Sequence, residues 1–336
     1  MSVLYVLLAI IALSVLMIFH EYGHYLAAKK LHYPVTAFGI GFGPNIVKKQ
    51  IGETEFRVGI LLFGAYVEVP AMDGEGNLTI KPLHKVAIAL AGPLMNFILA
   101  FLVVFIVLVG GNPLEPSTVV GSVVPNSSAA EVLQIGDKIL QVDGKSVSSF
   151  EDFQRIVANK KVGDKAPLVI ERSHEELTVE VEVRKLTYEG ESFVGVGISG
   201  APTKYSPLAA LRKSFQELWT MVKELWKALV LIISRPKNVE VMGIIGITAT
   251  MANFAKANLM LFLYLVAFIS ANLGFINLVP FPALDGSLIL VGLIESVIRR
   301  PLPKNWVNMV NIIGFVCLMG LMIYVSLLDI GRLMGL

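Results

Sequence analysis

The stretch IFHEYGHYLAA, residues 18–28, follows a long apolar run at the N-terminal side of the chain. It places two histidines and a glutamate, His20, Glu21 and His24, within five consecutive positions. Ionisable side chains inside a membrane span are costly and mark functional sites. The stretch therefore predicts a membrane-spanning helix that carries a polar centre.

The composition of the whole chain indicates a membrane protein. Of its 336 residues, 55% are hydrophobic and only 16% are charged, and the mean hydropathy is +0.70. Soluble domains contain about 25% charged residues. The net charge of +2 gives no reason to expect a nucleic-acid partner, and the single cysteine, Cys317, excludes an internal disulfide.

A cleaved secretory signal peptide is the alternative interpretation of the N-terminal segment. The sequence LAAK at residues 26–29 could serve as a cleavage site, but no Lys or Arg precedes Lys29. The apolar run from Val3 to Phe19 is also longer than the hydrophobic region of most signal peptides. We therefore expect this segment to be retained as a span.

Four apolar segments are long enough to cross a bilayer, which takes about 20 residues of helix. They cover residues 2–27, 86–110, 258–279 and 306–326. Residues 206–234 have apolar side chains at helical spacing that charged residues interrupt, so we expect an amphipathic helix on the membrane surface. Residues 241–253 are too short to cross, and we expect them to be interfacial or partly inserted.

Residues 116–200 have a different pattern from the rest of the chain. Apolar and polar residues alternate there in short runs, and turn signals such as Asp143-Gly144 separate the runs. This pattern predicts a small β-rich domain inserted between two spans. The fold class predicted from the residues is a multi-pass α-helical membrane protein, of about four transmembrane helices, with this insertion.

The basic residues predict the orientation in the membrane. Residues 29–85 and 299–304 both carry several Lys and Arg, whereas none precedes the first span. Because short cytoplasmic connections are enriched in Lys and Arg, we expect both connections on the cytoplasmic side. The inserted domain follows the second span and is then extracytoplasmic.

The sequence His20-Glu21-Tyr22-Gly23-His24 has the spacing H-E-x-x-H. Positions four apart share one face of a helix, so both imidazoles can bind one Zn²⁺ while Glu21 serves as general base. A catalytic zinc needs a third protein ligand, and Asp285 is the candidate. It lies at the end of the third span, at the same membrane level as the histidines if residues 206–234 stay on the surface. The alternative role for Asp285 is the N-cap of the helix that follows, and it could serve both.

Three motifs, in this order, resemble the site-2 protease family of intramembrane zinc metalloproteases: HEYGH at 20–24, GPLMNF at 92–97 and NLVPFPALDG at 277–286. The single inserted domain resembles a PDZ domain, which points to the bacterial, PDZ-containing branch that includes the sigma-E regulator protease. The resemblance implies Zn²⁺ as cofactor, His20, His24 and Asp285 as its ligands, and Glu21 as the catalytic residue. Many relatives have a second glycine where this chain has Ser287, and we expect this difference to alter local packing rather than coordination.

The resemblance also implies residues that bind substrate or organise the site. Asn96, Asn272 and Asn277 are polar residues on apolar helices, and their alternative role is an interhelical hydrogen bond worth about 0.6 kcal/mol. Residues 54–69 have strand-turn-strand character, and the resemblance implies a re-entrant β-hairpin there that includes Gly64. An exposed strand edge could bind an unwound substrate by β-addition. The alternative is a cytoplasmic hairpin with a structural role only.

Together these features predict a zinc-dependent intramembrane endopeptidase that cleaves transmembrane segments, such as pre-trimmed anti-sigma factors or signal-peptide remnants. We expect it in the bacterial inner (cytoplasmic) membrane, with the PDZ domain outside and the active site near the cytoplasmic side. Its expected partners are transmembrane protein or peptide substrates and the lipid bilayer, with no nucleic acid; the sequence carries no signal for an oligomeric state. The alternatives are a non-enzymatic membrane PDZ adaptor with a structural metal, and a membrane-anchored metalloprotease acting on soluble chains.

The same reasoning divides the chain into four parts. An N-terminal membrane core contains the H-E-x-x-H helix, the hairpin and the second transmembrane helix, and a C-terminal core contains the LDG motif and the last transmembrane helix. The PDZ domain and the amphipathic or interfacial helices lie between these cores. In chain order the four parts are residues 1–115, 116–200, 201–256 and 257–336.

Overall fold

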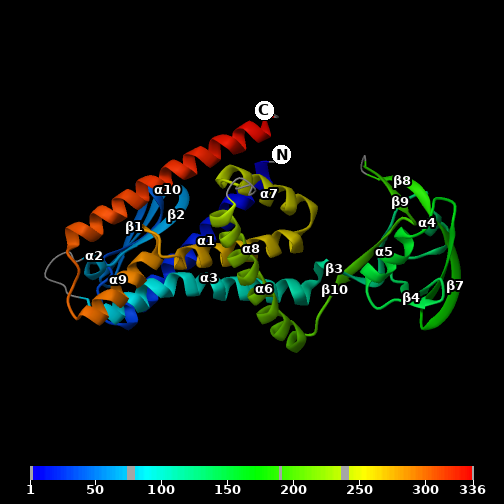
Figure 1. Ribbon diagram of the computed structural model, residues 1–336, viewed down its shortest axis with the longest axis horizontal. Helices are drawn as coiled ribbons and strands as arrows, with labels where there is room; N and C mark the ends of the chain where they lie inside the picture. Colours follow the sequence, from blue (N-terminus) through cyan, green and yellow to red (C-terminus); the bar gives the residue numbers. More distant parts are fainter. Residues whose placement is uncertain (1–2, 74–79, 189–190, 236–241, 335–336) are drawn as a thin grey trace. The chain divides into compact units, whose positions relative to one another are not determined.

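The computed structural model describes residues 3–73, 80–188, 191–235 and 242–334, and Figure 1 labels its helices and strands. The chain forms two compact units. One unit comprises residues 1–106 and 211–336, and the other comprises residues 107–210.

Four helices of the first unit are long and apolar enough to cross a membrane. They are α1 (Val3–Lys30), α3 (Pro82–Gly110), α8 (Leu259–Leu278) and α10 (Lys304–Leu333). These helices confirm the four apolar segments expected from the sequence. The amphipathic segment is the single helix α6 (Pro207–Ser234), which is not among the candidate spans in the described part of the chain.

The helix α7 (Ile244–Ala257) packs against α1 and α8 around one apolar cluster. Leu16, Met251 and Phe262 contribute one large, almost completely buried side chain from each of these helices. The predicted interfacial or partly inserted position of this segment stays a prediction. The cluster holds the first and third spans together, which brings the C-terminal half of the chain next to the H-E-x-x-H helix.

Glycines let the spans approach one another closely near the histidines. A Cβ atom at Gly23 of α1 would collide with the backbone of Ala91 on α3. A Cβ atom at Gly274 of α8 would lie 2.9 Å from the carbonyl oxygen of Pro93. Small residues allow such backbone contacts between membrane helices, where packing rather than hydrophobicity drives association.

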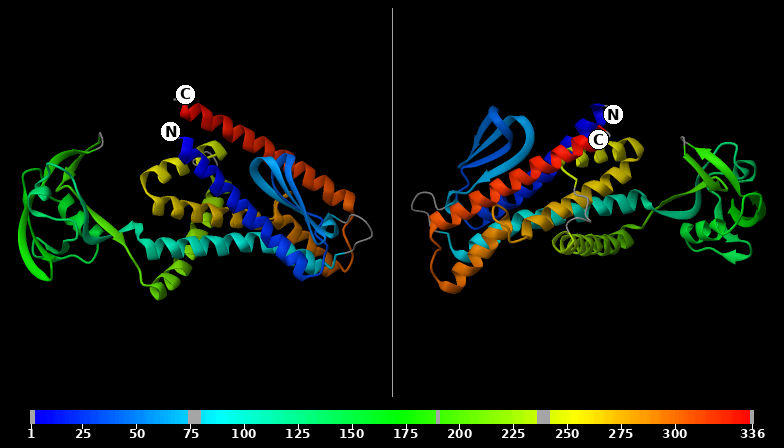
Figure 2. Two further views of the ribbon diagram at one scale, coloured as in Figure 1. Left: turned by 180° about the vertical axis from the view of Figure 1, so that it is seen from behind. Right: turned by 45° about the horizontal axis from the view of Figure 1, so that its top comes forward.

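The strands β1 (Ala37–Ile51) and β2 (Thr54–Glu68) form a two-stranded antiparallel sheet, and Figure 2 shows it beside α1. Phe38 pairs with both Phe56 and Val67, so the start of β1 lies between two parts of β2. We expected a strand-turn-strand within residues 54–69. The structure adds the upstream partner strand β1, which a tight turn at Gly52, where φ is 61°, joins to β2, and residues 55–58 and 65–68 of β2 lie on opposite sides of the start of β1.

The remaining elements of the first unit connect these parts. A short helix, α2 (Pro70–Asp73), follows the hairpin, and α9 (Asp285–Ile298) lies between α8 and α10. The loop before α9 contains Pro280 and Pro282, which end α8 because proline cannot continue the helical hydrogen-bond ladder. This loop positions the LDG motif at the start of a new helix.

The second unit is β-rich, as residues 116–200 predicted. Its main sheet has the strand order β10-β3-β4-β6-β7, with β5 paired to β4, and β8 pairs with β9 separately. Its core is a continuous cluster of aliphatic and aromatic side chains, in which Ile139, Leu168 and Ile170 are completely buried. Its elements are β3 (Asn112–Val123), α4 (Ser128–Val132), β4 (Lys138–Val142), β5 (Lys145–Ser146), α5 (Phe150–Ala158), β6 (Lys165–Arg172), β7 (Glu175–Glu182), β8 (Arg184–Tyr188), β9 (Glu191–Gly195) and β10 (Ile198–Thr203).

Candidate metal centre

The helix α1 presents both histidines on one buried face. His20 and His24 lie one helical turn apart, and each residue is 7% exposed. Their Nε2 atoms are 3.3 Å apart. Two imidazole nitrogens at this distance, in an apolar helix, form one half of a potential metal site.

Asp285 supplies a third donor from the first residue of α9. Its Oδ2 atom lies 2.9 Å from Nε2 of His20 and 3.3 Å from Nε2 of His24. This oxygen is buried and accepts no hydrogen bond in the described part of the chain. The N-cap position belongs to Leu284, so capping does not account for the aspartate. The structure thus brings together the three residues that the sequence predicted as ligands.

The spacing of these three donors fits a zinc ion. Zinc bonds of 2.0–2.1 Å in a tetrahedral arrangement require ligand atoms about 3.3 Å apart. The separations here are 2.9, 3.3 and 3.3 Å. Imidazole nitrogen and carboxylate oxygen are both common zinc ligands, and three protein ligands are the usual number for a catalytic zinc.

The helix α3 orients both imidazole rings through their Nδ1 atoms. Nδ1 of His24 lies 2.7 Å from the backbone oxygen of Ile88 and donates to it. The neutral ring then keeps its Nε2 lone pair free for a metal. This contact supports a ligand role for His24.

Asn96 is the corresponding partner of His20. Its Nδ2 atom lies 3.0 Å from Nδ1 of His20, and its Oδ1 atom is buried without a partner in the described part of the chain. The amide oxygen and nitrogen have nearly the same shape, so their assignment follows from hydrogen bonding. With the amide turned over, Oδ1 accepts the Nδ1 proton of His20, which satisfies the buried oxygen and frees Nε2. The sequence predicted a substrate role for Asn96, which stays a prediction.

Gly92 forms the surface of α3 that faces the two rings. A Cβ atom at this position would collide with the His24 imidazole and lie 2.9 Å from Nε2 of His20. The absence of a side chain therefore leaves room for the metal site. Gly92 was not predicted individually as a site residue, although the Gly-Pro pair inside an apolar span was the available signal.

Glu21 lies beside the donor cluster and is partly buried. Its carboxylate interacts electrostatically with His20, His24 and Asp285, and it is close to the backbone N–H of Val67 on β2. The predicted general base therefore lies between the metal donors and one strand of the hairpin.

The loop and the first turn of α9 fix the position of Asp285. Ala283 has φ of 71°, and its backbone N–H donates to Oδ1 of Asn311 on α10 at 3.3 Å. Gly286 packs so closely on the end of α8 that a Cβ atom would collide with the backbone of Val279. The hydroxyl of Ser287 donates to the backbone oxygen of Leu284 at 2.8 Å.

The other predicted site residues lie around this centre without joining it. Asn272 and Asn277 are half-buried on α8, and Nδ2 of Asn277 donates to the backbone oxygen of Leu273 at 2.9 Å. Gly64 is a buried bend in β2 with φ of 91°, where a Cβ atom would meet the Phe42 ring. Substrate binding by these three residues stays a prediction.

Comparison with known proteins gives consistent matches along the chain. The sequence profile of peptidase family M50 matches residues 8–321. A presumptive zinc metalloprotease of Clostridium perfringens is 35% identical, covering 97% of this chain and 98% of its own. Metalloprotease MmpA of Caulobacter vibrioides is 30% identical over 95% of this chain and 94% of its own. Zinc metalloprotease RasP of Geobacillus kaustophilus is 26% identical over 96% and 97%.

Similar solved structures cover part of the chain. The PDZ domain of an SdrC-like protein from Listeria monocytogenes is 28% identical, with a TM-score of 0.22, and covers 25% of this chain and 85% of its own. The corresponding PDZ domain from Listeria innocua is also 28% identical, with a TM-score of 0.22, and covers 24% of this chain and 90% of its own.

Proposed function

The chain belongs to peptidase family M50, and we propose that it is a zinc-dependent endopeptidase that cleaves transmembrane segments of other proteins within the membrane. One observation carries this proposal. Asp285 meets both histidines of an H-E-x-x-H sequence on a helix that is apolar enough to span a bilayer. A metalloprotease for soluble chains does not need its metal donors inside such a helix.

The proposed ligands of the zinc ion are His20, His24 and Asp285. Their mutual distances fit zinc, and similar proteins along the whole chain are named zinc metalloproteases. When bound, zinc lowers the pKa of a coordinated water to about 7 and polarises the carbonyl of the scissile peptide. Ile88 and Asn96 hold the two imidazoles in the orientation that ligation requires.

Glu21 is the proposed general base and acid. It is not needed to bind the metal, and it lies next to the donor cluster on the same helix. Its carboxylate would take a proton from the attacking water and transfer it to the leaving amide nitrogen, which is the usual role of the glutamate in this spacing.

The hairpin is the proposed substrate platform. A transmembrane helix must unwind before its peptide bonds can be cleaved, and its freed backbone groups then need hydrogen-bond partners. Residues 65–68 of β2 pair on one side with residues 37–40, and no second strand pairs with them in the described part of the chain. Because Val67 on this edge lies beside Glu21, a substrate strand added here would pass the catalytic site.

Exposed apolar side chains support a position of this hairpin in the membrane, as a re-entrant element. Phe42, Ile46, Ile60 and Leu61 are each at least 50% exposed. Such a cluster is unusual for strands that face only water. The alternative, a water-exposed hairpin, would leave these side chains without apolar contact.

The proposed location is a bacterial inner membrane, with the metal site near the cytoplasmic side. Lys29 and Lys30 end α1 only two turns beyond His24, which supports this orientation through the positive-inside rule. The inserted β-rich unit is then extracytoplasmic. We further propose that it is PDZ-like and acts as a steric filter, admitting substrates whose outer part has been trimmed, such as anti-sigma factors or signal-peptide remnants.

Substitution of the proposed base tests this function directly. Glu21→Gln should retain zinc and lower the cleavage rate of a model transmembrane helix by about a hundredfold or more. His24→Ala should lose both zinc and cleavage, and the control Tyr22→Phe, on an exposed neighbour, should keep both. Normal cleavage by Glu21→Gln would overturn the role of Glu21 as the base, whereas normal cellular function of this variant without cleavage would favour a non-enzymatic adaptor.

A further inference from the structure

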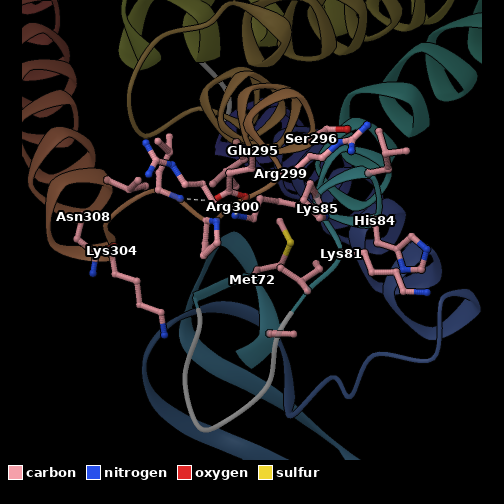
Figure 3. Close-up of a pocket in the computed structure, with 18 of the residues that line it drawn as sticks. Met72, Lys81, His84, Lys85, Glu295, Ser296, Arg299, Arg300, Lys304 and Asn308 are labelled. Carbon is pink, nitrogen blue, oxygen red and sulfur yellow. Dashed lines mark hydrogen bonds and ion pairs between the residues drawn. The ribbon is translucent and has the colours of Figure 1, made fainter.

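A cavity of about 700 Å³ lies apart from the metal donors in the described part of the chain. Its walls come from α2, the first turn of α3, the end of α9 and the start of α10. Figure 3 shows Lys304 and Asn308 on one side of it and Lys81 and His84 on the other. Its charged lining is Lys81, Lys85, Glu295, Arg299, Arg300 and Lys304.

Glu295 is the one carboxylate among the described residues of this lining, and a lysine already neutralises it. Glu295 is 4% exposed, and its Oε2 atom lies 2.6 Å from Nζ of Lys85. Its Oε1 atom accepts a hydrogen bond from the backbone N–H of Leu302 at 3.0 Å. Glu295 therefore joins α3 to α9 and the loop that follows, and Lys81, Arg299 and Arg300 add positive charge to the cavity lining.

The cavity lies where two candidate spans begin. The apolar helices α3 and α10 start at Pro82 and Lys304, and both residues line it. Large apolar side chains next to it are open to the surroundings: Leu83 is 61% exposed, Val297 is 81% exposed and Trp306 is 61% exposed. Tryptophan is enriched at the boundary between membrane and water, so the positive cavity meets an apolar surface at headgroup level.

We propose that this cavity binds the phosphate-bearing headgroup of an anionic phospholipid, whose acyl chains lie along the exposed apolar side chains of α9 and α10. The guanidinium groups of Arg299 and Arg300 suit phosphate because each can donate two parallel hydrogen bonds. The volume is within the range of small-ligand pockets, about 300–1,000 Å³. Basic pockets between membrane helices on the cytoplasmic side are typical sites for anionic lipid headgroups.

Lipid titration of the purified full chain tests the proposal. The delipidated protein is titrated with phosphatidylglycerol or phosphatidylcholine in detergent, and bound lipid is counted by native mass spectrometry. We expect a saturable phosphatidylglycerol site that phosphatidylcholine does not fill. The double variant Arg299→Gln/Arg300→Gln should weaken this site roughly thirtyfold, since each cation near a membrane surface contributes about a factor of five.

A matched control removes the same charge elsewhere. Lys223→Gln/Lys227→Gln, at two exposed positions of α6, should bind phosphatidylglycerol as the wild type does. If Arg299→Gln/Arg300→Gln lowers the unfolding temperature, the double variant Lys81→Gln/Arg300→Gln is used in its place. It removes one cation from each wall of the cavity and should lose the same affinity for phosphatidylglycerol. Wild-type affinity in whichever of the two cavity variants folds normally would overturn the proposal.

A final arm distinguishes a lipid from free phosphate. Inorganic phosphate at millimolar concentration should leave the bound phosphatidylglycerol in place, because the lipid gains additional apolar contacts. Displacement of the lipid by inorganic phosphate alone, or equal binding of phosphatidylcholine, would show that the cavity is not an anionic lipid site.

Discussion

The Oδ2 atom of Asp285 lies 2.9 Å from the Nε2 atom of His20, although the two residues are 265 positions apart in the sequence. The chain brings them together by packing α8 against α1 and by starting α9 at the aspartate. A buried carboxylate oxygen that accepts no hydrogen bond and faces two imidazoles is costly unless a cation satisfies it. The contact thus gives the physical basis for the proposed zinc site.

Replacing Asn96 should weaken zinc binding without unfolding the protein. Asn96→Leu removes the partner of His20 Nδ1, and loss of such an outer contact typically costs 10- to 100-fold in metal affinity. Asn96→Asp keeps an acceptor of the same shape and should lose less. Competition with a chelator measures both constants, and equal affinity in the leucine variant and the wild type would argue against the orienting role.

Adding one methyl group at Gly92 should displace the imidazoles. Gly92→Ala places a Cβ atom against His20 and His24, so we expect a loss of zinc of at least tenfold in affinity. Gly320→Ala on α10 is the matched control, since no atom lies within 4 Å of its added Cβ. The zinc content per protein molecule, measured after dialysis, distinguishes the two variants. An unchanged zinc content in Gly92→Ala would mean that α3 does not lie this close to the metal site.

Removing the backbone N–H of Val67 should impair substrate binding at the hairpin edge. Val67→Pro deletes one donor on the edge beside Glu21 and should lower kcat/KM for a transmembrane substrate by roughly tenfold, the value of about one hydrogen bond. Zinc content should not change. The control Ile46→Pro changes an exposed position of β1 that has no strand partner in the described part of the chain, and this variant should cleave the substrate at the wild-type rate. Equal rates in the two variants would count against β-addition.

The β-rich unit should lose stability in acid through Asp137. Two hydrogen bonds from the Arg172 guanidinium, of 2.7 and 2.6 Å, hold the pKa of Asp137 below its ordinary value. The stabilisation is therefore complete above the unfolded-state pKa of about 3.9 and is lost as the pH falls through the lower folded-state value. Asp137→Asn should unfold more easily than the wild type at neutral pH, and this difference should disappear in acid.

Hydrogen exchange at amides of residues 107–210 in the full chain follows this unit alone. Glu176→Gln, which removes an exposed carboxylate from the same unit, should exchange as the wild type does at every pH. A difference between Asp137→Asn and wild type that persists unchanged into acid would contradict the ion-pair explanation.

The local parts of the metal centre could be predicted from the sequence because they follow from helix geometry. Four-residue spacing places His20 and His24 on one face wherever the helix lies. The prolines before Asp285 also predict the end of one helix and the start of another. Apolar segment length likewise gave the four candidate spans.

The contacts between elements could not be predicted in the same way. The position of Gly92 and Asn96 against the histidines depends on how far α3 is shifted and rotated relative to α1. The sequence of either helix alone does not determine this relative position. The upstream strand β1 was not predicted, since three glycines alternate with apolar residues between 37 and 43, and glycine is disfavoured in strands. Its pairing depends on contacts with β2 instead.

The most direct test of the zinc site is anomalous X-ray scattering at the zinc absorption edge from crystals of the purified protein. The account predicts a single strong peak about 2.0–2.2 Å from Nε2 of His20, Nε2 of His24 and a carboxylate oxygen of Asp285. A zinc peak beyond bonding distance of Asp285, or no peak between these three side chains in zinc-saturated crystals, would contradict it.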